Sequence, residues 1–404
     1  MATKIFVSEQ QENTRTDMAA RPIHVLTLTP FYPFADDDAS GCFIAEPLPR
    51  LAAHQVHSSV IAVQPFYRRR PRPNPAASPA KWFSFLSLPG SKGLPSAGTL
   101  LSWSLVAHVR DLHRHRKIDL IHAHSALPCG HAAMRLSRDL GIPFVVSVHG
   151  LDAFSTRQVS GRAGERCHEI SDQVYRAASC VLCVSEHVRE QVLLGATGPV
   201  NTELVYNGVD PDVFFPGTAA NDPDQPTVLS VGDVIPTKGQ ELVLRAVARL
   251  KAQFPQVQYE IIGDGPHLLS LQKLARSLNM EGRVHFRGRR SRREVAEAMR
   301  NCAVFALPSR YEGLGCAYLE AMSCARPVIA CRGQGIQEII RHRENGWLVD
   351  GTRVDEMTEA LTCLLSNPEA RAQIGRSARR TIVNNLTLSH QAERLNRVYR
   401  GCLA

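Results

Sequence analysis

The stretch SRYEGLGCAYLEAM, residues 309–322, places two carboxylates on either side of a pair of glycines. Glu312 and Glu320 are the carboxylates, and Gly313 and Gly315 are the glycines. The apolar run CAVFALP just before them predicts a strand, and CAYLEAMSC predicts a helix that begins close to the second glycine. The glycines are therefore expected at the junction between a strand and a helix.

This junction suits the chemistry of a bound diphosphate. Free backbone N–H groups and the dipole at a helix start favour an anion, and glycines let a phosphate approach the backbone closely. Glu320 lies about one turn into the helix, roughly 6–8 Å along it, where its carboxylate can hold the two hydroxyls of a ribose. Glu312 lies on the other side of the phosphate and can hold a sugar hydroxyl. The order indicates a nucleotide sugar; the alternative is two surface glutamates around a turn.

Further polar residues follow other predicted strands. Lys238 stands after a strand and at a helix start, where its charge can neutralise a diphosphate, unless it is simply solvated. His149 and Asp152 follow a strand in the first half of the chain, and strand carboxyl ends face the cleft in open α/β sheets. The glycine turn IIGDGP lacks the full Gly-x-Gly-x-x-Gly pattern, which argues against a nicotinamide oxidoreductase.

Short apolar runs alternate with amphipathic stretches along most of the chain, and this alternation predicts βαβ units. The runs are apolar on both faces, as buried parallel strands require. They lie at 23–28, 58–63, 119–124, 143–148, 179–184, 227–232, 257–263, 284–288, 302–308 and 326–331. The predicted fold class is α/β, with two Rossmann-like doubly wound domains that face each other across a cleft.

The alternation lapses once, at NGVDPDVFFPGTAANDPDQP, whose Pro, Asp, Asn and Gly content predicts a linker between domains. The predicted divisions are a disordered tail at 1–20, a first domain at 21–206, the linker at 207–226, a second domain at 227–386 and a closing helix at 387–404.

The composition is that of an ordinary globular protein, since 44% of the 404 residues are hydrophobic and 21% are charged. No apolar run reaches the ~20 residues of a membrane-spanning helix, and the N-terminus lacks the apolar core of a secretion signal. Eleven cysteines, spread through apolar segments, predict reduced thiols in a cytosolic protein. Cys180 and Cys183 form a CxxC inside a predicted buried strand, and no second CxxC completes a zinc site. The aspartate run at 36–38 is interpreted as a solvated turn. No metal site is predicted.

The net charge of +9 favours anionic partners. The sharpest cluster is FYRRRPRP, in which Phe66 and Tyr67 precede arginines at positions 68, 69, 70 and 72, and the aromatic stretch KWFSFLSLPG follows it. Arginines beside interfacial aromatics predict a patch for a membrane surface or a lipid phosphate; a solvated proline-rich loop is the alternative. Nucleic acid is disfavoured because no recognised binding motif accompanies the charge.

Together these segments resemble a known enzyme family. LPSRYEGLGCAYLEAMSCARPVIA closely resembles the signature of glycosyltransferase family four, which comprises retaining enzymes of the GT-B fold. VGDVIPTKG, IIGDGP, FRG, NGVD and HGLD follow the order and spacing of that family, as does TPFYPFADDDASGCFIAEPLPRLA near the start. The resemblance covers roughly residues 22–402.

The resemblance implies a role for each matching residue. Glu320 would hold the ribose of the donor, Glu312 and His149 would contact the transferred sugar, and Gly41 would lie where donor phosphate and acceptor meet. The remaining implied donor residues are Lys238 and the backbone of Gly313, Leu314 and Gly315 at the diphosphate, and the backbone around Arg287 and Gly288 at the base. The turn Asn207–Asp210 matches the region between the domains.

The resemblance also implies the type of reaction. It implies a retaining, metal-independent hexosyl transfer with no cofactor, in which a nucleoside diphosphate sugar, with a UDP-sugar favoured, is the co-substrate. The expected path is front-face attack, in which the leaving phosphate accepts the acceptor's proton. The basic patch suggests a glycan or polyprenyl-linked acceptor in bacterial surface polysaccharide assembly, met in the cytoplasm at the inner face of the plasma membrane.

One departure from the family keeps other functions open. Many members carry Arg where this chain has Asp233, five residues before Lys238, and an anion there repels phosphates if it points inward. Either Asp233 faces elsewhere and a cation such as Arg310 substitutes, or donor binding is altered. This departure keeps a non-catalytic scaffold or binding subunit open as an alternative. Enzymes of the same fold with another reaction type, a sugar-nucleotide epimerase or a phosphorylase, are further alternatives.

Overall fold

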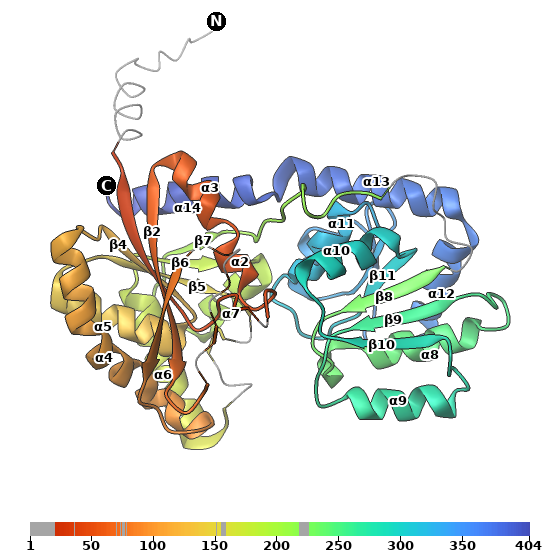
Figure 1. Cartoon of the computed structure of the whole chain (residues 1–404), viewed down its shortest axis with the longest axis horizontal. Helices are drawn as coiled ribbons and strands as arrows, with labels where there is room; N and C mark the ends of the chain where they lie inside the picture. Colours follow the sequence, from red (N-terminus) through yellow and green to blue (C-terminus); the bar gives the residue numbers. More distant parts are fainter. Residues whose placement is uncertain are drawn as a thin grey trace, which may run out of the picture.

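The computed structural model describes residues 21–35, 37–69, 71–72, 74, 77, 79–150, 152–154, 159–217 and 226–404. The predicted tail at 1–20 lies outside this part. Figure 1 shows two α/β domains side by side, each built on a parallel sheet, with α13 and α14 running along both of them. The predicted fold class is confirmed.

The first sheet has seven strands in the order β3-β2-β1-β4-β5-β6-β7, all parallel. The strands are β1 Ile23–Thr29, β2 Val56–Pro65, β3 Ala80–Phe85, β4 Leu120–His124, β5 Phe144–Val148, β6 Cys180–Cys183 and β7 Thr202–Leu204. The intervening helices and turns are α2 Cys42–Ala45, α3 Leu48–Leu51, η1 Ala52–His54, η2 Ser91–Gly93, α4 Leu94–His115, η3 Ala126–Gly130, α5 His131–Leu140, α6 Gly161–Ala177 and α7 Glu186–Gly195.

The second sheet has six parallel strands in the order β10-β9-β8-β11-β12-β13. They are β8 Thr227–Val231, β9 Gln258–Ile262, β10 Val284–Gly288, β11 Val304–Leu307, β12 Val328–Cys331 and β13 Trp347–Val349. The helices are η4 Pro236–Lys238, α8 Gln240–Leu250, α9 Leu268–Ser277, α10 Arg292–Asn301, α11 Cys316–Ser323, η5 Gly335–Glu338, α12 Val354–Ser366, α13 Pro368–Asn385 and α14 Leu388–Gly401.

Three strands were not predicted from the sequence. β7 and β13 have three residues each, which is too short for a pattern to stand out. β3 contains the aromatic stretch that was interpreted as a membrane-surface patch. It forms the edge of the first sheet beside β2, with Phe85 buried and Lys81 exposed, so its alternation is that of an edge strand.

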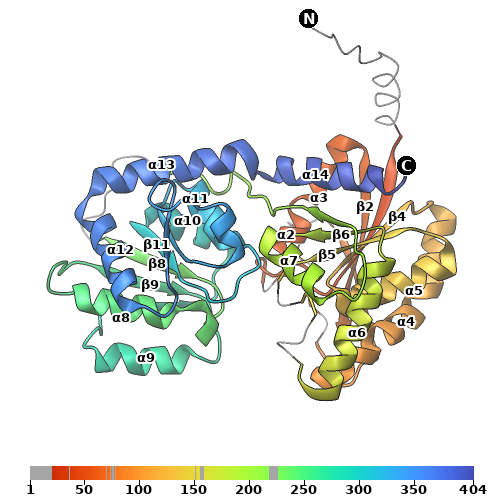
Figure 2. The same cartoon turned by 180° about the vertical axis from the view of Figure 1, so that it is seen from behind.

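The last helix belongs to the face of the first sheet. Ala392, Leu395 and Tyr399 of α14 are buried with Ile23 and Val25 of β1 in one hydrophobic cluster. Figure 2 shows α13 on the second domain and α14 continuing onto the first, close to the C-terminus. The chain end therefore completes the core of the domain in which the chain began.

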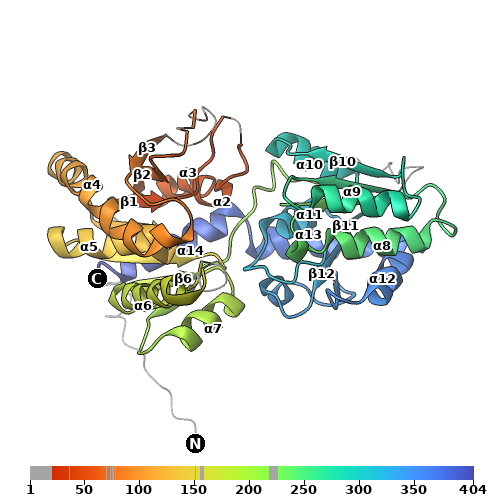
Figure 3. The same ribbon diagram turned by 90° about the horizontal axis from the view of Figure 1, so that it is seen from below.

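Two segments cross between the domains, and they are hydrogen-bonded to each other. Val209 of the outgoing segment donates its N–H to the carbonyl of Leu386 at 2.9 Å and accepts the N–H of Leu388 at 3.0 Å. A Cβ on Gly208 would lie 2.4 Å from the carbonyl oxygen of Thr387, so only glycine permits this approach. Seen from below, the domains are two separate bodies on either side of this connection (Figure 3).

Within the described part of the chain, no helix combines the length and the apolar character needed to cross a bilayer.

Truncation of a core residue on α14 tests the importance of this helix to the first domain. Leu395 is 5% exposed, so Leu395→Ala is expected to lower the free energy of unfolding by about 2–4 kcal/mol through lost burial and a residual cavity. Urea unfolding followed by circular dichroism measures it. Arg397→Ala on the same helix, where the side chain is 74% exposed, is the control and is expected to change stability by less than about 1 kcal/mol. Equal effects of the two changes would contradict the packing described here.

Candidate active site

The candidate residues gather at the carboxyl ends of the central strands of both sheets. Strand order reverses beside β1 and β4 in the first sheet and beside β8 and β11 in the second, and such switch points are where open α/β sheets bind ligands. Loops leaving β1, β8 and β11 carry Gly41, Lys238 and Glu312, and His149 follows β5, the strand next to β4.

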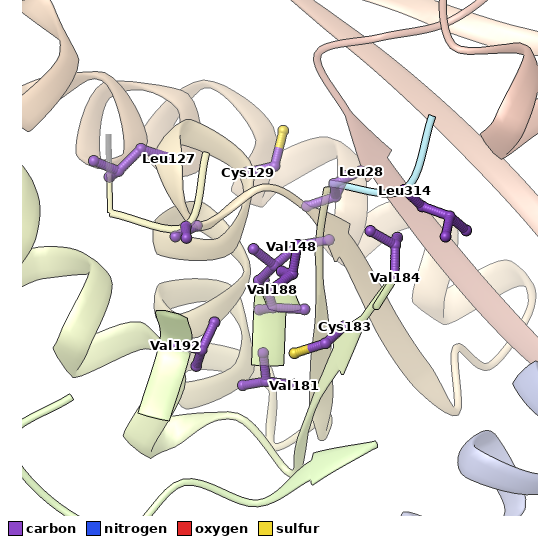
Figure 4. Packing of buried hydrophobic residues seen from close by; sticks show 14 of the residues in the cluster. Leu28, Leu127, Cys129, Val148, Val181, Cys183, Val184, Val188, Val192 and Leu314 are labelled. Carbon is purple, nitrogen blue, oxygen red and sulfur yellow. The ribbon is translucent and has the colours of Figure 1, made fainter. Parts of the chain in front are cut away.

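The glycine-rich loop after β11 touches the first domain. A Cβ on Gly313 would lie 2.0 Å from the carbonyl oxygen of His149, and the side chain of Ser185 donates to the Gly313 carbonyl at 2.6 Å. Leu314 is buried, and Figure 4 shows it entering the hydrophobic cluster that contains Leu28 and Val184 of the first domain. The loop is thereby fixed between the domains.

The same loop presents unpaired backbone donors at a helix start. Gly315, with φ of 81°, is the residue before α11, which begins at Cys316. Within the described residues, the N–H groups of Gly313, Leu314 and Gly315 donate to no acceptor. Unsatisfied N–H groups of this kind are what an anion binds at a helix N-terminus.

Lys238 and Glu312, predicted separately for the diphosphate and the sugar, contact each other. The Lys238 ammonium lies 2.6 Å from Glu312 Oε2, and the side chains are 21% and 15% exposed. Lys238 ends η4, and Arg310 donates its backbone N–H to the carbonyl of Thr237 in that turn at 2.8 Å. The Glu312 backbone N–H is in turn 3.1 Å from Gln334 Oε1. The cation is therefore adjacent to the glycine-rich loop.

His149 lies on the first-domain side of this loop. Its backbone N–H donates to Asp152 Oδ1 at 2.9 Å, and its Nε2 lies 3.1 Å from His124 Nδ1. The ring centroid is 4.8 Å from that of Phe43. Burial lowers the pKa of His149, so the imidazole is neutral at pH 7. The buried Nδ1 has no hydrogen-bond partner in the described structure.

Glu320 is 3% exposed and forms an ion pair with Arg292, the first residue of α10. Arg292 also contacts Glu46 of the first domain at 2.7 Å. The sequence analysis missed Arg292 and Glu46, because no spacing rule connects positions so far apart in the chain. The predicted ribose carboxylate is thus paired within the protein.

The aspartate run was interpreted wrongly as a solvated turn. Asp37 Oδ2 lies 2.7 Å from Arg289 Nη1, and both carboxylate oxygens of Asp38 accept the backbone N–H of Arg292 at 3.1 Å. Asp36 lies outside the described residues. The carboxylates of Asp37 and Asp38 therefore bind residues at the start of α10 across the domain boundary. Their negative charge also interacts favourably with the positive end of the helix dipole there.

The other three candidates occupy less central positions. Gly41, with φ of 68°, precedes α2, and a Cβ there would lie 2.5 Å from the Phe31 carbonyl carbon. Gly288, with φ of 66°, accepts the N–H of Gly263 at 2.9 Å. The Arg287 side chain pairs with Glu260 at 3.4 Å rather than with another candidate residue.

Comparisons with known proteins identify the family of this chain. Residues 41–213 match the family model described as Glycosyltransferase Family 4, and residues 215–381 match Glycosyl transferases group 1. An uncharacterized glycosyltransferase of Methanocaldococcus jannaschii is 30% identical over 263 residues, covering 65% of this chain and 70% of the relative.

The chain belongs to the group 1 glycosyltransferases.

Two further similarities concern proteins whose names contain a nucleotide sugar. The GDP-mannose-dependent alpha-(1-6)-phosphatidylinositol monomannoside mannosyltransferase of Mycolicibacterium smegmatis is 32% identical over 240 residues, covering 55% of this glycosyltransferase and 63% of the relative. The Anabaena HepE structure in complex with UDP-glucose superposes with a TM-score of 0.70 at 19% identity, covering 92% of this chain and 97% of that one.

The departure at Asp233 has a structural counterpart in this glycosyltransferase. The Asp233 side chain is 62% exposed, and its Oδ1 lies 3.4 Å from Arg289 Nη2. Arg289, which the sequence analysis did not single out, is thus shared between Asp37 of the first domain and Asp233 of the second. The cation beside Asp233 is Arg289. Arg310, the residue named from the sequence, forms no ion pair with any of the described residues, and its backbone N–H donates to the Thr237 carbonyl.

A histidine network lies behind His149 in the glycosyltransferase. His122 Nδ1 is 2.7 Å from the Tyr399 hydroxyl of α14, and its Nε2 is 2.7 Å from the Ser147 hydroxyl. The rings of His124 and His149 stack at 5.3 Å between centroids. Burial lowers the pKa of His122 to about 3 and that of His124 well below 6.5, so the folded protein keeps these imidazoles neutral.

These histidines predict a loss of stability in mild acid. Below pH about 6.5 these histidines are protonated in the unfolded chain but stay neutral in the folded chain. The free energy of unfolding therefore falls as the pH is lowered toward 4. Each such histidine contributes up to about 1.4 kcal/mol per pH unit. Urea unfolding at pH 7.5, 6 and 4.5 measures the slope. His122→Gln should flatten it, whereas His57→Gln at an exposed position should not. A slope that His122→Gln leaves unaltered would contradict a neutral, buried His122.

Proposed function

We propose that this glycosyltransferase moves a sugar from a nucleoside diphosphate sugar to a glycan or lipid-linked glycan, with retention of configuration and without a metal ion. The observation that carries the proposal is the glycine-rich loop. One short strand-to-helix segment carries the unpaired N–H groups and the Glu320 carboxylate, and the Lys238 ammonium of a neighbouring turn contacts Glu312 of the same segment.

In this proposal the diphosphate binds at the N–H groups of Gly313, Leu314 and Gly315. Lys238 turns from Glu312 toward the phosphates as they bind, which leaves Glu312 to accept a hydroxyl of the transferred sugar. Charge develops on the leaving diphosphate as the glycosidic bond breaks, and donors fixed in advance stabilise that charge most effectively. The two-domain contacts of the loop supply this rigidity.

Retention by front-face attack suits the carboxylates near the loop. A double-displacement mechanism needs a carboxylate nucleophile about 5 Å from a carboxylic acid. Here Glu320 is paired with Arg292, and in this proposal Glu312 accepts a hydroxyl of the transferred sugar once Lys238 has turned to the phosphates. Under front-face attack the leaving phosphate takes the acceptor proton, and neutral His149 contributes its unpaired Nδ1 to the donor sugar.

For the acceptor, we infer a pocket of the first domain with a volume of about 710 Å³. Its lining combines three arginines, Arg68, Arg69 and Arg72, with the aromatic rings of Tyr32, Phe34, Tyr67, Trp82 and Phe85. Ser40 also lines it, so the pocket reaches the loop of Gly41, where the family resemblance implies that donor phosphate and acceptor meet. Arg70 of the basic cluster lies outside the described residues.

This lining favours an acceptor with an anionic group and an apolar or ring portion. The name of the mycolicibacterial relative states a phosphatidylinositol monomannoside as acceptor, which agrees with that chemistry. Phe66 of the basic cluster is exposed, as are Leu86 and Leu88 directly after β3, and exposed apolar side chains near arginines favour contact with an anionic membrane surface. A step of bacterial surface polysaccharide assembly at the inner leaflet is the setting we propose.

A thermal-shift screen tests the donor assignment. UDP, UDP-glucose, GDP and GDP-mannose are added without metal to the wild type and to Glu320→Ala. One base series is expected to raise the melting temperature of the wild type, because a ligand that binds only the folded state stabilises it. Glu320→Ala should weaken binding by about 1–3 kcal/mol through lost ribose hydrogen bonds. Absence of any shift in the wild type would favour a non-catalytic scaffold instead. Repulsion of the phosphates by Asp233 would then be the first explanation to test.

A second assay tests the acceptor pocket. Arg69→Gln is expected to raise the KM for a polyprenyl-diphosphate-linked glycan roughly tenfold while the affinity for the nucleotide stays unchanged, because a charge-assisted hydrogen bond is lost from the pocket only. Arg114→Gln, on α4 away from the pocket lining, is the matched control. An unchanged KM in Arg69→Gln, or an equal rise with a neutral acceptor, would exclude an anionic acceptor in this pocket.

A further inference from the structure

Two partly buried charged groups, Arg292 and Glu46, connect the buried carboxylate of Glu320, the predicted ribose ligand, to the other domain. Glu320 lies on α11 and Arg292 on α10, both in the second domain, while Glu46 lies between α2 and α3 in the first. The side chains are 4%, 15% and 30% exposed. Ion pairs this well shielded are screened little by salt, so their geometry is more strictly held than that of surface pairs.

The guanidinium of Arg292 divides its donors between the two carboxylates. Nε and Nη2 contact Glu46 Oε1 at 3.0 and 2.7 Å, and Nη1 contacts Glu320 Oε1. Burial lowers the pKa of Arg292, but Glu320 and Glu46 outweigh this and raise it, so the side chain stays charged. The ring of Phe214, 4.8 Å from the guanidinium carbon, covers it from one side.

This division leaves one oxygen of Glu320 without a partner in the described structure. Oε1 accepts a hydrogen bond from Arg292, and Oε2 accepts none from the described residues. An ionised carboxylate has about four acceptor positions, and a ribose needs two of them for its hydroxyls. Arg292 therefore satisfies part of the buried charge and fixes the plane of the carboxylate, while capacity for a diol remains.

Glu46 determines which N–H groups of the Arg292 guanidinium remain for Glu320. A guanidinium with no competing partner favours a bidentate pair with a carboxylate, with two parallel N–H···O bonds. Without Glu46 at Nε and Nη2, the guanidinium of Arg292 could rotate and donate to both oxygens of Glu320. Oε2 of Glu320 would then be occupied. Asp38 adds to the restraint, because it binds the backbone N–H of Arg292 from the first domain.

We propose that Arg292 is a positioning residue for the donor ribose. In this proposal Glu46 of the first domain keeps Arg292 in the orientation that leaves Oε2 of Glu320 free for the ribose. The nucleotide site of the second domain is then complete only when the first domain is docked against it. This inference rests on the proposed function in one respect, namely that Glu320 holds the ribose hydroxyls.

A comparison of nucleotides with and without those hydroxyls tests the proposal in the full-length protein. The dissociation constants of UDP and 2′,3′-dideoxy-UDP, and of the guanosine pair, are measured by calorimetry. The wild type should prefer the ribose form roughly tenfold to a hundredfold, as expected for hydrogen bonds to a charged group. Glu46→Gln should reduce that preference by roughly three- to tenfold and weaken the dideoxy form little. A purely structural role of Glu46 would weaken both forms equally.

Two further variants keep the result interpretable. Glu338→Gln removes another contact between the domains, because Glu338 accepts the N–H groups of Glu186 and His187 at the start of α7, each at 2.8 Å. It should leave the ribose preference at the wild-type value even if overall affinity falls. Arg292→Lys keeps the charge but lacks the fork, and it should lose the preference as Glu46→Gln does. It also serves as the test if Glu46→Gln fails to fold, which circular dichroism reports.

The outcomes separate this inference from the function on which it rests. Equal weakening of both nucleotides by Glu46→Gln, or a lost preference in Glu338→Gln, would overturn the positioning role. A wild type that binds both forms with the same affinity would overturn the ribose role of Glu320 and the inference with it. A wild type that binds no nucleoside diphosphate would instead refute the proposed donor chemistry.

Discussion

The arrangement of both domains depends on one close approach between backbones. The carbonyl of Gly313 accepts a hydrogen bond from Ser185 of the first domain, and a Cβ on Gly335 would lie only 1.7 Å from that same carbonyl oxygen. On its other side, Gly313 lies against the carbonyl of His149. No residue with a side chain fits between these groups, so glycine here is a requirement of contact and not only of loop flexibility. The same packing that fixes the loop also places Lys238, Glu312 and His149 around it.

Charges at this boundary are arranged as chains rather than as isolated pairs. Arg289 lies between Asp37 and Asp233, and Arg292 lies between Glu46 and Glu320, so each arginine joins one domain to the other. A buried ion pair costs desolvation that only good geometry recovers, and such groups often specify an arrangement more than they stabilise it. The chains favour one relative orientation of the domains, in which the donor residues and the proposed acceptor pocket meet at the loop around Gly41.

The sequence predicted the parts of this site that local pattern determines. Strands that are apolar on both faces, and glycines and polar residues at their carboxyl ends, place Lys238, His149 and Glu312 at the cleft without knowledge of any contact. The contacts of Arg292 with Glu46 could not be predicted, since they join residues 246 positions apart through two domains. β3 was missed because its aromatic content resembles an interfacial patch, and Asp37 and Asp38 because a polar run before a glycine is typical of a solvated turn. In each case the partner that changes the interpretation is distant in the sequence.

The two crossing segments have a mechanical consequence. A single covalent tether would let the domains swing and twist about any axis. Here an isolated parallel bridge pairs Val209 with the segment of Leu386 and Leu388, so the two crossing segments are tied to each other as well as to both domains. A pair of tied segments restrains twisting between the domains more than one flexible segment would. The hydrogen bonds of a single residue, Val209, therefore help to keep the two halves of the candidate site in a fixed relation.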